Sequence, residues 1–168
     1  MSQHDDTQLI DTAGLNEYFH RAVHEAADQR HVHAEPATLH YLILMLSDHA
    51  RSDRLFDYGD GRLQLRPLAL LYGDALAATS AHERRLWLQR LGDLALFVGG
   101  LFAGRLSRRF SDLDYCVAMG GNAYGYLGQT APRNGDQAIV FGELAAGFAH
   151  FVDLVAIATG RSPVHRDA

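Results

Sequence analysis

Residues 94–103 form an unbroken run of apolar residues and glycine, and this run limits the folds open to the chain. A helix of this composition is apolar on every side, so it belongs at the centre of a domain where neighbouring elements cover it all round. The run is flanked by Asp93 and Arg105, and it is far shorter than the roughly 20 residues that span a membrane. We therefore expect a helical domain built around one buried helix, with no membrane contact.

Apolar residues recur at helical spacing along most of the chain, whereas the alternating pattern typical of strands is almost absent. Pro36 and Pro67 suit the first positions of helices, and Ser80 with Glu83 matches a capping box. The sequence predicts an all-α fold, a single-domain helical bundle of about six helices with a buried central helix at residues 82–108. The other predicted helices cover residues 11–30, 36–51, 66–78, 111–128 and 137–159.

A chain of 168 residues has the usual length of one domain and can bury a sizeable core. Residues 57–61 read as a turn and residues 129–136 as a loop, but no linker or repeat divides the chain. We expect residues 1–10 to be a disordered N-terminal segment, residues 11–160 to be the helical domain, and residues 161–168 to be a frayed C-terminal tail.

All 15 basic residues of the Lys and Arg class are arginine, and the chain contains no lysine. Schiff-base and general-base lysine chemistry is therefore excluded, as is a P-loop. The formal net charge is −5, which does not favour binding to nucleic acid or to an anionic membrane. The single Cys116 cannot form an internal disulfide, and the polar N-terminus does not resemble a secretory signal, so we expect a cytoplasmic protein.

Residues 115–128 hold several glycines within a predicted helix, where each costs about 1 kcal/mol relative to Ala, so the folded protein must compensate. One explanation is close helix packing, with Gly121 and Gly125 on one face and Gly100 and Gly104 repeating that spacing in the preceding helix. The other explanation is functional: a second face of the same helix lines a ligand pocket or an interface between copies of the chain. Its residues are Tyr115, Met119, Asn122 and Tyr126.

The first predicted helix is rich in histidine, which makes it a candidate metal site. Glu17, His20, His24 and His31 fall near one another on its surface, and imidazoles four residues apart can chelate Zn or Ni. The Glu17-x-x-His20 spacing also matches half of a di-iron carboxylate site, but no second such motif occurs. The alternative is that these polar side chains simply form the solvent-exposed face of the helix and bind no metal.

Six arginines gather within residues 84–109, where they bracket the most apolar segment. Arg105 and Arg109 are candidates for binding a small anionic ligand, although pairing with nearby Asp residues is the ordinary alternative. Asp93 stands at the entrance to the apolar run, where an unpaired carboxylate would be costly. We expect it to find Arg90, a hydroxyl group or a helix terminus.

No arrangement of nucleophile and base emerges, since the serines lack a nucleophile-elbow motif and Cys116 lies in an apolar stretch.

The segments RLGDLALFVGGLF at residues 90–102 and DLDYCVAMGGNAYGYL at residues 112–127 are similar to a family of uncharacterised all-helical proteins from proteobacteria. The likeness covers roughly residues 18–155. It implies no activity, cofactor or catalytic residue, and it implies that the Gly and Tyr segment matters more than the His-rich helix.

Our first interpretation is a cytoplasmic helical protein with a non-enzymatic binding or regulatory role. It would act through homodimerisation or contact with another protein, with residues 90–126 as the interaction surface. One alternative is a metal-binding helical-bundle protein or enzyme that uses the His-rich helix with a transition metal (Zn, Ni or Fe). The other is a small-ligand sensor with a pocket beside the Gly and Tyr helix.

Overall fold

The chain folds into helices, as the computed structural model shows for residues 3–51, 66–101, 103 and 110–160. These residues form seven helices and no strand. The predicted all-α fold is therefore confirmed, and the helices pack as one bundle. Their bounds are α1 Gln3–Arg30, α2 Pro36–Arg51, α3 Arg66–Ala77, α4 Ala81–Leu101, α6 Phe110–Thr130, α7 Asp136–Ala146 and α8 Phe148–Ala158.

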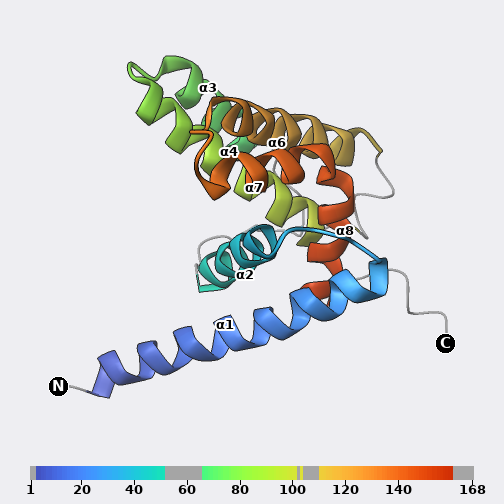
Figure 1. Cartoon of the computed structure of the whole chain (residues 1–168). Helices are drawn as coiled ribbons and strands as arrows, with labels where there is room; N and C mark the ends of the chain where they lie inside the picture. The colour runs from blue at the N-terminus through green and yellow to red at the C-terminus, as the bar shows by residue number, and fades with distance from the viewer. Residues whose placement is uncertain (1–2, 52–65, 102, 104–109, 161–168) are drawn as a thin grey trace.

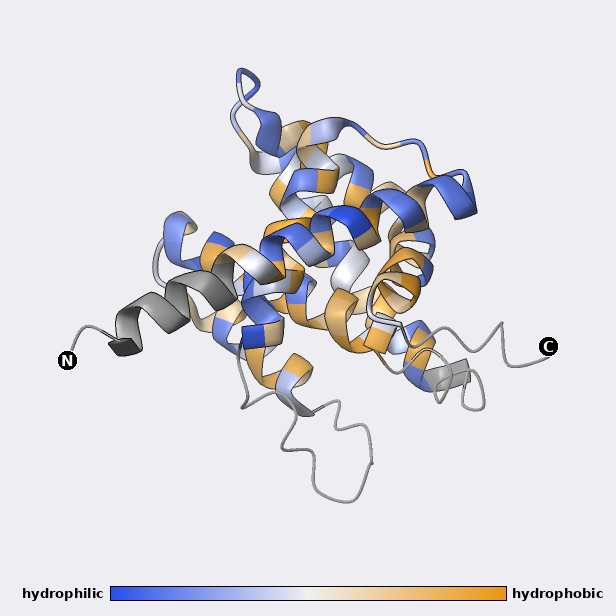
Figure 2. Ribbon diagram, turned by 90° about the horizontal axis from the view of Figure 1, so that it is seen from below, coloured by the Kyte–Doolittle hydropathy of each residue, from blue (hydrophilic) through white to orange (hydrophobic). Residues whose placement is uncertain are grey.

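The helices form two groups joined by α8 (Figure 1). In one group α4 packs against α3 and α6, and α6 packs against α7. In the other, α1 packs against α2. The last helix, α8, contacts both α4 and α1, so it connects the groups. In Figure 2 the coloured part of α1 presents mostly hydrophilic residues to the viewer, and hydrophobic positions lie behind it.

The centre of the bundle is the second half of α4. Every residue from Leu91 to Leu101 is buried except Asp93, which is partly buried. The predicted buried central helix is therefore present, although its proposed extension beyond residue 101 lies mostly outside the described residues. Ser80 Oγ accepts a hydrogen bond from the backbone N–H of Glu83 at 3.1 Å, as a capping box requires. The Glu83 carboxylate bonds Thr79 rather than Ser80.

The predicted single helix at residues 137–159 is wrong, because the structure divides it into α7 and α8 with a bend of 90°. Gly147 stands at the bend, where its N–H closes α7 on the carbonyl of Glu143 at 2.9 Å. Its φ of −114° and ψ of 29° depart from helical geometry. The apolar pattern continues across this glycine, so periodicity alone does not show the break.

At the N-terminal end, α1 begins at Gln3, whereas residues 1–10 are predicted from the sequence to be disordered. No Gly or Pro occurs between residues 3 and 12, so nothing in this segment stops the helical hydrogen bonding. The predicted tail at residues 161–168 lies outside the described residues. Within the described ranges, no single helix is long and apolar enough to cross a membrane. Only α7 and α8 taken together have the required length and apolar composition, and they are bent by 90° relative to each other.

The glycines of α4 and α6 do pack closely, but not along the predicted seam. A Cβ at Gly120 would lie 3.0 Å from Ala95 Cβ and closer still to the buried Phe148 ring of α8. Gly100 faces Val155 of α8 rather than α6. Gly128 lies against the backbone of α7, where an added Cβ would be 3.0 Å from the nitrogen of Gly142. Gly104, the fourth member of the predicted seam, lies outside the described residues.

Candidate functional site

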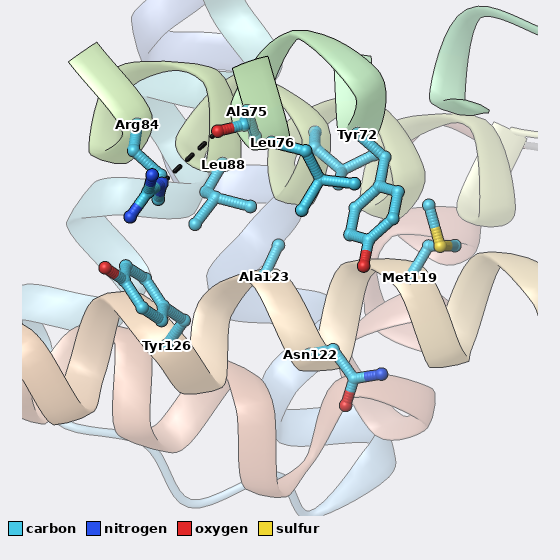
Figure 3. A pocket seen from close by; sticks show the side chains of 10 residues that line it. Tyr72, Ala75, Leu76, Arg84, Leu88, Met119, Asn122, Ala123 and Tyr126 are labelled. Atoms are coloured by element: carbon cyan, nitrogen blue, oxygen red, sulfur yellow. Dashed lines mark hydrogen bonds between the residues drawn. The ribbon is translucent and has the colours of Figure 1, made fainter. Parts of the chain in front are cut away.

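A pocket of about 610 Å³ opens between α3, α4 and α6. This volume falls within the range of small-molecule sites. Figure 3 shows its residues approaching one another from the three helices, with Arg84 and Tyr126 toward one end and Tyr72, Met119 and Asn122 toward the other. The lining residues are Tyr72, Ala75, Leu76, Arg84, Leu88, Leu91, Met119, Asn122, Ala123 and Tyr126.

Helical spacing explains how each element contributes its part of the wall. Met119, Asn122 and Tyr126 are separated by three and four residues on α6, so they share one face. Ala123 is small, which leaves room for the pocket between α6 and the other two helices. Leu88 and Leu91 of α4 close the floor, and both are buried. The wall is mainly apolar, with few polar groups.

Arg84 is the charged group of the pocket. Its guanidinium donates to the carbonyls of Ala75 at 3.3 Å and Ala78 at 3.4 Å, where α3 ends. The negative end of the α3 macrodipole partly compensates its charge. Within the described ranges, no Asp or Glu forms an ion pair with Arg84. Of its five N–H donors, these two bonds leave others for a further acceptor.

Two phenols add polar groups at the ends of the pocket. The hydroxyls of Tyr72 and Tyr126 form no hydrogen bond with any other described residue. Tyr72 is 45% exposed, so it lies at the mouth. Each hydroxyl can donate or accept, and the exposed Asn122 amide can do both. The pocket therefore offers one cation and several neutral hydrogen-bonding groups above an apolar floor.

Asp93 belongs to a separate polar cluster on another side of α4. Its Oδ1 accepts hydrogen bonds from the hydroxyl of Tyr41 of α2 at 2.5 Å and from the hydroxyl of Tyr124 of α6 at 2.7 Å. Gln89 donates to the Tyr41 hydroxyl at 3.1 Å. The expectation that Asp93 finds a hydroxyl is confirmed, whereas Arg90 lies over the ring of Trp87 instead.

Burial sets the protonation behaviour of this cluster. It raises the pKa of Asp93, and the hydrogen bonds from the two phenols oppose that rise only in part. Burial also raises the pKa of Tyr124 and of Tyr41, and the nearby Asp93 charge adds to both shifts. The phenols therefore remain neutral donors, and their hydrogen bonds to Asp93 join α2, α4 and α6.

The structure brings together only some of the predicted site residues. Met119, Asn122 and Tyr126 line the pocket, whereas Tyr115, although on the same predicted stripe, does not. Asp93 lies in the separate cluster. Arg105 and Arg109 lie outside the described residues. Arg84 belongs to the predicted arginine cluster, but the sequence does not assign it to a site. The other pocket residues that the sequence does not predict are Tyr72, Ala75 and Leu76 of α3, Leu88 and Leu91 of α4, and Ala123 of α6.

The predicted metal ligands lie at the surface along α1. Glu17, His20 and His24 are exposed, and the rings of the two histidines are 4.5 Å apart between centroids. His31 is exposed and lies just beyond the end of α1. Among the described residues, no group of three or more His, Cys, Asp or Glu side chains is arranged to hold a metal ion.

The lone thiol is buried in α6. Burial, with a smaller contribution from Asp112, raises the pKa of Cys116 to about 11. The thiolate is therefore scarce near neutral pH, and this thiol is a poor nucleophile.

Comparison of the chain with known proteins adds no assignment: no family model, no curated protein and no solved structure matches it.

Proposed function

We propose that the chain binds a small amphiphilic molecule with an acidic group in the pocket between α3, α4 and α6. The observation that carries this proposal is the position of Arg84. Its guanidinium borders a mainly apolar pocket, and no described carboxylate neutralises it. A ligand carboxylate would form charge-assisted hydrogen bonds with this group. The rest of the ligand would cover the apolar floor of Leu88 and Leu91.

This proposal corresponds to the small-ligand alternative from the sequence, with a pocket beside the Gly and Tyr helix. The described residues that line the pocket include no carboxylate that would repel an acid, and no base or nucleophile that would act on one. A binding or sensing role therefore fits its chemistry better than catalysis does.

Isothermal titration with a panel of aliphatic and aryl-aliphatic carboxylic acids, each paired with the alcohol of the same skeleton, tests the proposal. We expect saturable binding of acids and about tenfold weaker binding of the matched alcohols, equal to about 1.4 kcal/mol. An acid present at 100 times its dissociation constant should add about 2.7 kcal/mol to the free energy of unfolding.

Two variants locate the binding. Arg84→Met should lose the preference for acids over alcohols, because it keeps the apolar stem and removes the charge. Ala123→Leu should fill the pocket and abolish binding of both classes, whereas Ala118→Leu, on the exposed face of the same helix, should bind as the wild type does. Acid binding that Ala123→Leu leaves unchanged would contradict the proposal, as would a complete lack of binding across the panel.

Self-association through residues 90–126 and metal binding at Glu17, His20, His24 and His31 stay predictions from the sequence. Light scattering tests the first, for which a dimer mass is expected and a monomer mass at all concentrations is the contrary result. Elemental analysis of untagged protein tests the second, because a structural or catalytic site should carry a near-stoichiometric load of transition metal.

A further inference from the structure

A second cleft lies where the end of α1 meets the bend between α7 and α8. Its volume is about 500 Å³, and it shares no residue with the α3–α4–α6 pocket. Three separate parts of the chain form it: the end of α1, the connection to α2, and the α7–α8 bend. The lining residues are Arg30, His31, Val32, His33, Glu143, Ala146, Gly147, His150 and Phe151.

Four of the lining side chains are basic. Arg30 ends α1, His31 and His33 lie in the connection to α2, and His150 lies in the first turn of α8. All four are exposed. The C-termini of α1 and α7 and the N-terminus of α8 border the cleft. Because two of these three helix ends are negative, the positive charge of the cleft comes from its basic side chains.

The acidic groups around the cleft are engaged elsewhere or lie at its edge. The Glu143 carboxylate accepts from the backbone N–H of Glu35 at 3.1 and 3.3 Å and from the buried Thr38 hydroxyl at 3.0 Å. It therefore caps the start of α2. The Glu35 side chain is exposed and does not line the cleft.

His31 has a backbone conformation that favours glycine. Its φ is +52°, and it is the position that follows the end of α1 in a Schellman motif. The two hydrogen bonds of that motif are present, from Val32 N–H to Ala27 O at 2.9 Å and from His31 N–H to Asp28 O at 3.3 Å. Glycine would adopt this conformation without steric cost. A histidine here gives up stability while placing an imidazole at the cleft, which points to a use for that imidazole.

The mixture of groups favours an anion over a metal ion. Arg30 repels cations, and no three potential ligands among the described side chains are arranged around one point. Imidazole and guanidinium N–H donors from three parts of the chain suit the acceptor oxygens of a phosphate group. Val32, Ala146 and Phe151 add an apolar wall, which gives an organic substituent a surface to contact.

We infer that this cleft binds the phosphate group of a small phosphate monoester through Arg30, His31, His33 and His150. The inference does not rest on the ligand proposed for the α3–α4–α6 pocket. It depends on side chains from three parts of the chain that only the folded protein brings together.

Titration of the full chain with phenyl phosphate at about pH 6, where imidazoles ordinarily carry much positive charge, tests the inference. The signals of the ring protons of His31, His33 and His150 are followed by NMR. We expect saturable shifts of these signals with phenyl phosphate, weaker saturation with inorganic phosphate, and none with phenol. Sodium chloride at matched ionic strength should not reproduce the shifts.

The variant His31→Gly separates binding from folding. We expect a higher melting temperature than the wild type, because glycine suits the left-handed position, together with about tenfold weaker phosphate binding. His150→Ala should also weaken binding, whereas His24→Ala should not, because His24 is exposed on α1 and does not line the cleft. Ala123→Leu, which fills the other pocket, should leave phosphate binding intact.

Three outcomes would overturn the inference: phosphate binding unchanged in His31→Gly and His150→Ala, equal shifts with chloride, or tight binding of Zn²⁺ by the same three histidines with no response to phosphate. The last outcome would identify a metal site instead.

Discussion

Asp93 accepts hydrogen bonds from two phenols. Tyr41 and Tyr124 donate to the same carboxylate oxygen, and both come from helices that pack on α4 from different sides. Burial raises the pKa of this carboxyl, so the folded protein binds its proton more tightly than the unfolded chain does. The free energy of unfolding must therefore depend on pH through this residue.

Asp93→Asn tests this dependence. Below the ordinary pKa of an aspartate, the wild-type carboxyl is protonated in both states and its stabilising effect is complete. As the pH rises from there through the raised pKa of the folded state, the wild type loses stability and the asparagine variant does not.

We expect the stability of Asp93→Asn relative to wild type to rise by about 1.4 kcal/mol for each pH unit inside this window, and to be constant on either side. Urea unfolding of both proteins across a pH series measures it. A stability difference that stays the same at every pH would show that the folded state does not perturb Asp93.

At the level of helices, small residues set how closely α4, α6 and α8 approach. Gly120 lies where the Phe148 ring and Ala95 leave no space for a side chain. Gly73 of α3, in contrast, has nothing within 4 Å of where its Cβ would be. The two glycines share a secondary structure and differ in packing, so they form a matched pair.

Gly120→Ala should lower the free energy of unfolding by about 1–3 kcal/mol, because the buried Phe148 has little freedom to move away. Gly73→Ala should raise it by about 0.5–1 kcal/mol through better helix propensity. Thermal or chemical denaturation of both variants measures the two effects. If both substitutions stabilised the protein, close packing would not be the reason for Gly120.

The ends of helices could be predicted where the sequence carries a capping residue or a proline, and could not be predicted elsewhere. Pro36 starts α2 as predicted, and Ser80 caps the start of α4. The break at Gly147 was missed because the residues on both sides of it are apolar at helical spacing. Gly also occurs within continuous helices of this chain, such as Gly92 and Gly120, so glycine alone does not mark a break.

Only the part of the candidate site that lies on one helix could be predicted from the sequence. Met119, Asn122 and Tyr126 share a helix, so their spacing places them on one face. Tyr72 and Arg84 reach the same pocket from α3 and α4, and only tertiary packing brings them there. The two phenols around Asp93 come from positions 52 and 31 residues away, which no local pattern connects.

Across the whole molecule, α8 couples the two groups of helices. It contacts α4 in the centre and α1 at the edge, and the Glu143 carboxylate ties α7 to the start of α2. Neither group therefore buries its apolar faces without the other. The core cluster accordingly includes residues from α1, α2, α3, α4, α6, α7 and α8.

We expect the chain to unfold in one cooperative transition. Far-ultraviolet circular dichroism reports all helices, whereas the fluorescence of Trp87, the single tryptophan, reports the first half of α4. The midpoints of urea unfolding measured by the two signals should coincide. An earlier transition seen only by circular dichroism would show that α1 and α2 unfold as a separate unit.

The bond between Glu143 and the start of α2 also bears on how the protein is made. The two partners, Glu35 and Glu143, are 108 positions apart along the chain. During synthesis on the ribosome, α1 and α2 emerge long before α7 and α8 exist. The Glu35 amide and the Thr38 hydroxyl must remain hydrated or find temporary partners until then. The junction of α1 and α2 thus reaches its final form only after residues 136–158 have been translated.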